Sequence, residues 1–287
     1  MSITTDSQKL IDRNRTVEDD APATYPAVSV SPYFRWKNVP GILLALALCV
    51  PGLPLILVLV ILVRISSSGP AIYRQVRVGR NGRTFTIYKL RTMRQDAEAT
   101  TGPTWATTDD PRVTRIGRLI RALHLDELPQ VFNVLFGDMS LVGPRPERPE
   151  FTQLLGRKIP GYLDRLAVRP GITGLAQINL PPDTDLDSVR RKVVLDREYV
   201  ESANALMDLR ILVCTCFRMV GIHGTVTRRL LRLERWDVVV AATRTTAADA
   251  DRTASIPSPV TATPHGNGRN GASPGPARQA VFKNRPR

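Results

Sequence analysis

The chain has few of the residues that hold small secreted domains or metal sites together. Its 287 residues include three cysteines and three histidines, namely Cys49, Cys214, Cys216, His124, His223 and His265. Neither set has the spacing of a disulfide framework or of a zinc site, so both are excluded as the basis of the fold. The pair at 214 and 216 lies in the apolar run ILVCTCF, where we expect small buried residues. We therefore expect a reduced protein that faces the cytosol.

Acidic residues are also scarce, with 26 Asp and Glu against 40 Lys and Arg and a formal net charge of +14. Such an excess allows binding to nucleic acid or to anionic lipid. Aromatic residues make up only 6% of the chain, and no nucleic-acid motif accompanies the charge. Nucleic acid is therefore not an expected partner. A non-enzymatic, membrane-anchored basic protein that binds anionic lipid or nucleic acid stays as the alternative hypothesis.

Apolar residues are unevenly distributed, and this divides the chain. Residues 1–38 are polar and without periodicity, and residues 246–287 are rich in Ala, Thr, Ser, Pro and Gly. Such compositions bury too little surface to offset chain entropy, so we predict disorder at both ends. Between them we predict a membrane helix over 39–65, a main domain over 66–220 and a helical extension over 221–245.

The one long hydrophobic run, Gly41–Val63, has 23 residues and no charge. It is long enough to enter a membrane, and its position and length do not fit a signal peptide. Pro51, Gly52 and Pro54 interrupt its middle, where a kink or a break is expected because proline removes a backbone donor.

Basic residues flank this run on both sides, with Arg35 and Lys37 before it and Arg64 after it. Most of the Lys and Arg excess follows the run, which predicts that the main domain lies on the cytoplasmic face. A straight span would leave basic residues on both faces, whereas a helix that dips in and returns would leave them on one. The charges alone leave both topologies open.

A β-hairpin is predicted directly after the run. The segments AIYRQVRV and TFTIYKL are rich in strand-forming residues, and Asn81-Gly82 between them suits positive φ angles. Four basic residues follow the two arms: Arg74, Arg77, Lys89 and Arg91. They indicate either a solvated basic hairpin beside an anionic membrane or an anion-binding site.

The next stretch predicts two helices with an acid pair between them. Arginines at 115, 118 and 121 share one face of the first helix, and the apolar residues 116, 119, 120 and 123 form the other. Asp126 stands where an N-cap would stand, with Pro129 in the first turn of a helix that ends near Gly137. Adjacent acids point in different directions, so Asp126 and Glu127 cannot share a proton as facing acids do. Two different roles suit them better: one acid attacks a phosphorus atom and the other binds a metal ion.

Three further features follow downstream. Arg145 lies between two prolines on a stiff loop, which suits bidentate contact with phosphate. Gly171 and Gly174 lie in a glycine-rich turn where backbone could approach a ligand. Residues 195–220 have the pattern of one long amphipathic helix that packs on the core or lies on the membrane face.

Taken together, these motifs resemble the bacterial sugar transferase family, the monotopic phosphoglycosyl transferases. The resemblance rests on SGPAIYRQVRVGRNGRTFTIYKLRTM, on DPRVTRIGRLIRALHLDELPQVFNVLFGDMSLVGPRP, on RPGITGLAQIN and on DREYVESANALMDLRIL. It covers residues 41–220 and implies a mostly helical α/β catalytic domain over 66–220. The implied anchor is a proline-broken re-entrant membrane helix, supplemented by amphipathic interfacial helices.

The resemblance implies transfer of a sugar 1-phosphate from a UDP-sugar to a polyprenyl phosphate, the first membrane step in assembling an exopolysaccharide or another glycan. Asp126 would be the nucleophile, forming an aspartyl phospho-sugar, and Glu127 would bind Mg²⁺. An alternative keeps Asp126 as a base while the lipid phosphate attacks directly. The other residues implied are Arg121, Arg145, Lys89 and Arg91 as phosphate ligands, and Gln177 and Asn179 as pocket lining.

The resemblance also places the protein on the bacterial cell membrane, with the catalytic domain on the cytoplasmic face. The family's membrane helix breaks at a proline that is preceded by serine, and Pro54 fits the spacing although Leu53 replaces the serine. This favours the re-entrant topology. After AQIN, residues 180–185 read LPPDTD instead of the family's Gly-Arg, which predicts a differently shaped pocket wall. The identity of the sugar and the oligomeric state do not follow from these motifs.

Overall fold

Helices dominate the computed structural model, which describes residues 28–95, 97, 110–222 and 224–242. In chain order the elements are η1 (Pro32–Arg35), α2 (Asn38–Ser66), β1 (Ile72–Val78), η2 (Arg80–Gly82), β2 (Thr84–Leu90), α3 (Arg115–Ala122), η3 (Leu125–Glu127), α4 (Gln130–Leu135), β3 (Ser140–Val142), α5 (Pro149–Lys158), η4 (Tyr162–Ala167), β4 (Gly171–Thr173), α6 (Leu175–Asn179), α7 (Leu186–Ser202), α8 (Ala205–Met219) and α9 (Gly224–Leu230). Most of the predicted disordered ends lie outside the described residues. The part that is described, residues 28–38, is instead ordered and contains η1.

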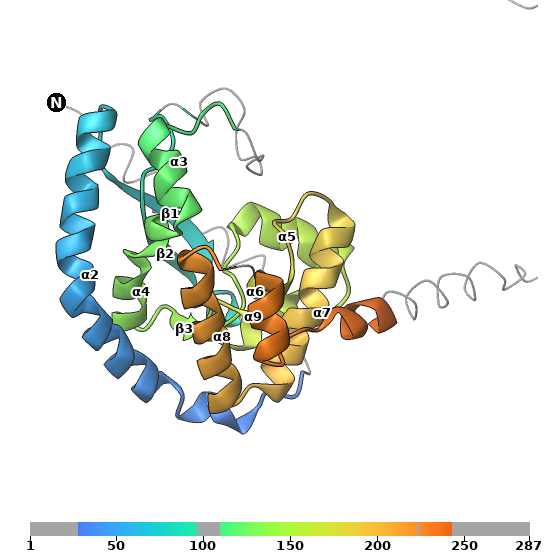
Figure 1. Cartoon of the computed structure of the whole chain (residues 1–287). Helices are drawn as coiled ribbons and strands as arrows, with labels where there is room; N and C mark the ends of the chain where they lie inside the picture. Colours follow the sequence, from blue (N-terminus) through green and yellow to red (C-terminus); the bar gives the residue numbers. More distant parts are fainter. Residues whose placement is uncertain (1–27, 96, 98–109, 223, 243–287) are drawn as a thin grey trace, which may run out of the picture. The chain divides into compact units, whose positions relative to one another are not determined.

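The hydrophobic run folds as one helix, α2, and the break predicted at Pro54 is absent. The helix continues through Pro51 and Pro54, and Figure 1 shows it bending along its length. Each proline removes one hydrogen bond of the helix, but 29 residues supply many others. One face is also held by packing, because a stripe of α2 is buried against the domain: Ala45, Cys49, Ile56, Leu59 and Val63.

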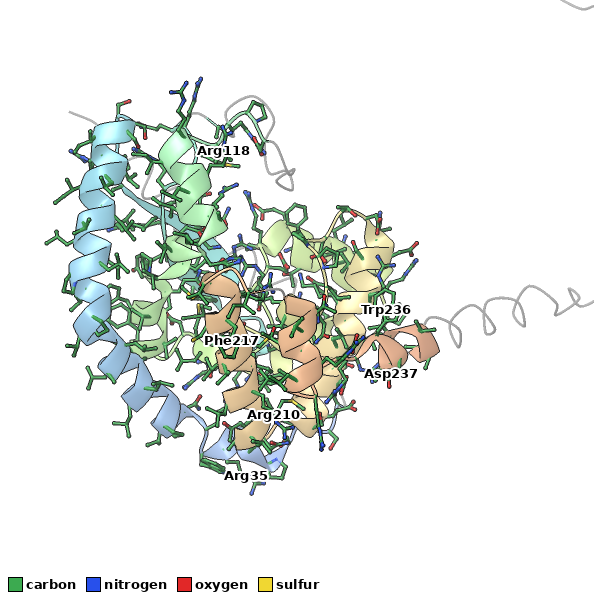
Figure 2. The ribbon with its side chains drawn as sticks, viewed as in Figure 1. Arg35, Arg118, Arg210, Phe217, Trp236 and Asp237 are labelled. Carbon is green, nitrogen blue, oxygen red and sulfur yellow. The ribbon has the colours of Figure 1, made fainter. Side chains whose placement is uncertain are left out.

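The other face of α2 is apolar and exposed, with Leu43, Leu46 and Leu57 each about 60% accessible. By length and composition, α2 is able to cross a membrane, so the protein is compatible with membrane association. Arg35 lies beside the N-terminal end of α2, and Arg118 on α3 lies beside its C-terminal half (Figure 2).

Both ends of α2 are bonded to the same domain. At the N-terminal end, the buried Lys37 ammonium lies 2.8 Å from the carbonyl oxygen of Val142, 2.8 Å from the Asp208 carboxylate and 2.5 Å from the Tyr199 hydroxyl. A buried cation needs such partners because its desolvation is otherwise costly. At the C-terminal end, Arg91 donates to the carbonyl and hydroxyl oxygens of Ser67 at 2.8 and 2.9 Å.

The predicted hairpin is confirmed. Strands β1 and β2 pair antiparallel from Ile72↔Leu90 to Val78↔Thr84. Asn81 and Gly82 have φ angles of 56° and 76°, the left-handed conformation that the turn requires. This hairpin carries Lys89 toward the acid pair.

Glycines let β3 and β4 pair closely as short parallel strands. A Cβ on Gly171 would lie 2.0 Å from the amide nitrogen of Gly143, and one on Gly174 would lie 2.2 Å from the carbonyl oxygen of Gly143. The glycines at 171 and 174 therefore admit another segment of backbone, not a ligand, contrary to the sequence-based interpretation. Their role is to hold the loop that follows β3, which carries Arg145.

Two helical predictions need correction. The single long helix expected over 195–220 is split, because α7 ends at Ser202 and α8 starts anew with the Asn204 side chain accepting a hydrogen bond from the Met207 amide. On α3, Ile120 is buried as expected, but Leu119 is 63% exposed.

The expectation that Cys214 and Cys216 are both buried is confirmed for Cys214 only.

Candidate active site

The acid pair lies on a tight turn between two helices, not at a helix start. Residues Leu125–Glu127 form the 3₁₀ turn η3, and α4 begins only at Gln130, so Asp126 is not an N-cap. His124, with a φ of 55°, turns the chain from α3 into η3. Gly137, with a φ of 84°, does end the helical segment as predicted.

Glu127 is held by two cations. Arg145 donates from Nη2 and Nη1 to the two carboxylate oxygens at 2.5 and 3.3 Å, and Lys89 donates from Nζ at 3.0 Å. Burial acts to raise the pKa of Glu127, but Arg145 and Lys89 outweigh it and hold this pKa well below its usual range. Glu127 is therefore ionised near neutral pH.

Asp126 has the opposite environment. Within the described part of the chain, no side chain donates a hydrogen bond to its carboxylate. Burial and the adjacent negative charge of Glu127 raise the pKa of Asp126, while Lys89, Arg145 and Arg121 act to lower it. The two neighbouring acids thus differ: Glu127 is fixed in an ion-pair network, and Asp126 is not.

The structure brings some of the predicted phosphate ligands to the acid pair and not others. Lys89 and Arg145 contact Glu127 directly, and Arg121 lies near enough to influence the charge of Asp126. Arg91, by contrast, contacts Ser67 at the end of α2 and bonds to neither acid among the described residues, so its predicted phosphate contact stays a prediction. Of the four basic hairpin residues, only Lys89 reaches Glu127; Arg74 stacks on Tyr88 at 5.9 Å, and Arg77 bonds to Pro146.

The two residues predicted to line the pocket both bond to nearby backbone. Gln177 donates to the carbonyl oxygen of Ile172, and Asn179 donates to that of Leu175. Asn179 also lines a polar cavity formed with the extension that follows α8, including Arg228 and Trp236.

One residue that holds Arg121 in place was not predicted from the sequence. The Thr92 hydroxyl lies 2.7 Å from Nε of Arg121 and so orients this arginine near Asp126. Thr92 belongs to the YKLRTM motif, but nothing in that motif indicates a partner 29 residues away.

A half-buried carboxylate with a raised pKa, a fixed neighbouring carboxylate and surrounding cations are typical of enzymes that act on phosphorylated substrates. Together with the apolar helix α2, this arrangement is compatible with a membrane-associated enzyme. The chain belongs to the bacterial sugar transferase family, whose model matches residues 33–221.

Several relatives support this membership. The chain is 45% identical over 162 residues to a UDP-N-acetylgalactosamine-undecaprenyl-phosphate N-acetylgalactosaminephosphotransferase of Aeromonas hydrophila, covering 56% of this chain and 38% of that protein. It is 41% identical over 185 residues to a UDP-glucose:undecaprenyl-phosphate glucose-1-phosphate transferase of Caulobacter vibrioides, covering 62% and 67%. An exopolysaccharide production protein of Rhizobium leguminosarum bv. phaseoli is 38% identical over 184 residues, covering 62% and 87%. The match thus spans well under half of the first relative and most of the third.

Proposed function

We propose that this protein transfers a sugar 1-phosphate from a UDP-sugar to a polyprenyl phosphate, such as undecaprenyl phosphate, and releases UMP. The observation that carries the proposal is the unequal acid pair, in which Asp126 is free and Glu127 is bound by Arg145 and Lys89. The relatives named for this reaction act on UDP-glucose or UDP-N-acetylgalactosamine, so the sugar is a separate question.

In the first step, a carboxylate oxygen of Asp126 attacks the phosphorus that carries the sugar. The bond from this phosphorus to the oxygen that bridges to UMP breaks, and the electron pair leaves with UMP. In the second step, an oxygen of the polyprenyl phosphate attacks the same phosphorus, and the bond to Asp126 breaks to regenerate its carboxylate. Lys89, Arg145 and Arg121 stabilise the negative charge in both steps.

Mg²⁺ fits this arrangement as a partner of Glu127. Glu127 is an ionised oxygen donor, the type that Mg²⁺ prefers, and the described residues contain no cluster of three or more His, Cys, Asp or Glu side chains. Phosphate oxygens and water would therefore complete its coordination. When bound, Mg²⁺ neutralises charge on the diphosphate. With Glu127 holding the ion, Arg145 and Lys89 would be available to phosphate oxygens.

We infer that α2 keeps both of its ends on the cytoplasmic face, as the re-entrant topology requires, but does so as one continuous bent helix at the membrane interface and not as a helix broken at Pro54. Two observations support this. Lys37 and Ser67, at opposite ends of α2, are both bonded to the domain. Between them, α2 packs along its length on α3, α4 and β3. A perpendicular span would carry these elements into hydrocarbon, whereas a helix lying at the interface presents only its leucine-rich outer face to lipid.

The test measures UMP release in membranes that contain the protein, with undecaprenyl phosphate and a panel of UDP-sugars. We expect UMP release with one sugar class and none from Asp126→Asn. Mass spectrometry of the protein quenched without acceptor should show a phospho-sugar adduct on the peptide that contains Asp126. Unchanged UMP release by Asp126→Asn would overturn the assignment. Turnover that requires Asp126 but yields no adduct would instead favour direct attack with Asp126 as the base.

A further inference from the structure

The backbone that carries Arg145 is held at four consecutive positions. The carbonyl oxygens of residues 144–147 each accept a hydrogen bond from a donor elsewhere in the domain. In order, the donors are the amide of Gly171 at 2.9 Å, Nη2 of Arg165 at 2.7 Å, Nη1 of Arg77 at 2.9 Å and the amide of Val78 at 2.9 Å. Two of these donors are arginine side chains, which is an unusual way to hold a loop, since most backbone carbonyls bond to other backbone.

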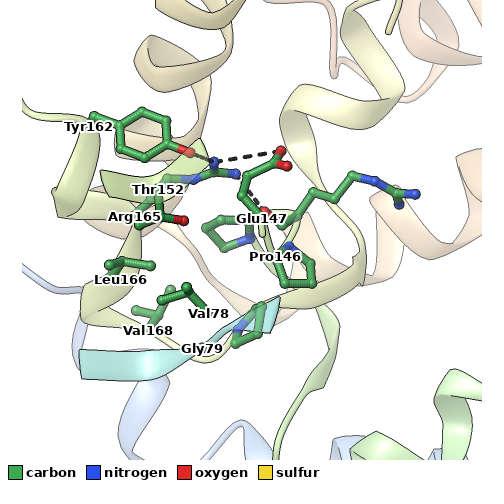
Figure 3. A pocket seen from close by; sticks show the side chains of 12 residues that line it. Val78, Gly79, Pro146, Glu147, Thr152, Tyr162, Arg165, Leu166 and Val168 are labelled. Atoms are coloured by element: carbon green, nitrogen blue, oxygen red, sulfur yellow. Dashed lines mark hydrogen bonds and ion pairs between the residues drawn. The ribbon is translucent and has the colours of Figure 1, made fainter. Parts of the chain in front are cut away.

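Arg165 is the more deeply placed of the two arginines, with a side chain only 3% exposed. Its guanidinium forms an ion pair with Asp196 at 2.8 Å and donates to the Tyr162 hydroxyl at 3.2 Å. Figure 3 shows it between Tyr162 and Glu147 in a small cavity behind the loop. These contacts fix the guanidinium plane, so the bond to the Arg145 carbonyl has a defined direction.

Glu147 completes this support from within the loop itself. Its carboxylate lies 2.5 Å from the Lys192 ammonium, 3.6 Å from Arg77 and 4.0 Å from Arg165. The two arginines that hold carbonyls of the loop are therefore also neutralised by a side chain of the loop. Among the described residues, no member of this cluster bonds to Asp126 or Glu127, and Arg145 joins the cluster to the acid pair by hydrogen bonds at both of its ends.

We propose that Arg165 is a positioning residue that acts through Arg145. The inference rests on the proposed function. By holding the Arg145 carbonyl, Arg165 fixes the base of a long side chain whose tip must meet Glu127 and, during the reaction, phosphate oxygens. A displacement of about 1 Å at such a donor is enough to cost on the order of 100-fold in rate.

The decisive variant is Arg165→Lys, which retains the positive charge beside Asp196 and Glu147 but loses the planar fork. We expect turnover to fall on the order of 10-fold or more. If the effect passes through Arg145, the double variant Arg145→Ala/Arg165→Lys will be no slower than Arg145→Ala alone. Fully additive losses, or wild-type turnover in Arg165→Lys, would overturn the proposal.

The matched control is Arg197→Gln. Arg197 joins the same two elements, η4 and α7, by an ion pair with Asp164 at 3.0 Å, but it does not contact the Arg145 loop. We expect this variant to keep wild-type turnover. A loss equal to that of Arg165→Lys would show that any weakening of the η4–α7 contact has the same effect, and would overturn the positioning role.

A second readout does not depend on activity. Hydrogen–deuterium exchange of the full-length protein should show faster exchange in Arg165→Lys confined to the peptides that contain residues 143–148 and 171, and no change there in Arg197→Gln. Uniformly faster exchange, or none, would contradict the proposal. If the wild-type protein released no UMP from any UDP-sugar, the proposed function would fail, and the exchange pattern would still decide whether Arg165 holds the loop.

Discussion

Arg145 meets Glu127 end-on, so that both terminal nitrogens of the guanidinium donate to the two carboxylate oxygens at 2.5 and 3.3 Å. This bidentate pairing fixes the plane of the carboxylate as well as its distance. Since Lys89 shares one of the same oxygens at 3.0 Å, the site holds two cations beside an ionised acid before any substrate arrives. It is therefore already arranged for an anionic ligand.

The bidentate contact predicts that Arg145→Lys is not a conservative change. Lysine reaches one oxygen at a time and has no planar fork, so we expect kcat/KM for the UDP-sugar to fall on the order of 100-fold, as when a preorganised donor is removed. Arg74→Lys, at an exposed hairpin residue whose guanidinium stacks on Tyr88, is the control and should retain full activity. Wild-type kcat/KM in Arg145→Lys would contradict this interpretation.

The environment of Asp126 predicts the pH dependence of adduct formation. Only the ionised carboxylate attacks, and burial raises the pKa of Asp126, so the rate should decline on acidification at a pH above the usual aspartate value of about 3.9. Lys89 acts to lower this pKa, so Lys89→Met should move the decline to higher pH. Quenched-flow measurement of the adduct against pH provides the test. A decline that stayed in place in Lys89→Met would mean that another group controls it.

Glu147 predicts how stability depends on pH. Lys192, Arg165 and Arg77 outweigh burial and lower the pKa of Glu147 from 4.5 to about 2. A lowered folded-state pKa contributes stability that is fully present above the unfolded value and is lost as the pH falls from about 4.5 toward 2. The contribution is roughly 3 kcal/mol. Glu147→Gln should therefore lower the free energy of unfolding at pH 7 and flatten its decline below pH 5. Denaturant unfolding of detergent-solubilised protein measures both, and an unchanged slope would refute the assignment.

The close approach of β3 and β4 predicts that Gly171→Ala destabilises the fold. The added methyl group would lie 2.0 Å from the Gly143 amide nitrogen, so the strands must separate, at a cost of about 3 kcal/mol or more. Gly52→Ala is the control, because a Cβ there meets no described atom within 4 Å. We expect a clear fall in melting temperature for the first variant and none for the second. Equal melting temperatures would mean that the strands can yield without loss.

The exposed face of α2 predicts which residues hold the protein in the membrane. Leu57 is 62% exposed on that face, and a charge there weakens membrane binding because the binding strength of an interfacial helix scales with its buried apolar area. Leu57→Asp should move a measurable fraction of the protein from the membrane to the soluble fraction on centrifugation. Val226→Asp, at a similarly exposed apolar residue on α9, should not. Retention of Leu57→Asp in the membrane would argue against lipid contact by this face.

Features set by neighbouring residues were predictable from the sequence, whereas contacts between residues far apart in the chain were not. The hairpin turn was accessible because Asn81-Gly82 encodes its own backbone angles. The acid pair and Arg145 could be identified because prolines lie close to them in the chain, at 129 and at 144 and 146. By contrast, Glu147 and Lys192 lie 45 residues apart, and no spacing rule connects them.

Assignments that relied on motifs alone were the weakest. Lys89 and Arg91 stand two residues apart in YKLRTM, yet one reaches Glu127 and the other holds Ser67. Just past the end of β2, the strand no longer dictates which way the Arg91 side chain points. Gly171 and Gly174 were correctly identified as sites of close approach, but the approaching group is the backbone at Gly143, which the sequence does not indicate.

The burial of Lys37 has a consequence for the order in which the protein is made. Two of its partners, Tyr199 and Asp208, follow it by 162 and 171 residues, and so leave the ribosome long after α2 does. Until then, of its three partners only the carbonyl oxygen of Val142 has been synthesised. The N-terminal end of α2 can reach its final place only when α7 and α8 have been synthesised. A chain that stops before α8 therefore lacks the carboxylate that pairs with Lys37 at the start of this helix.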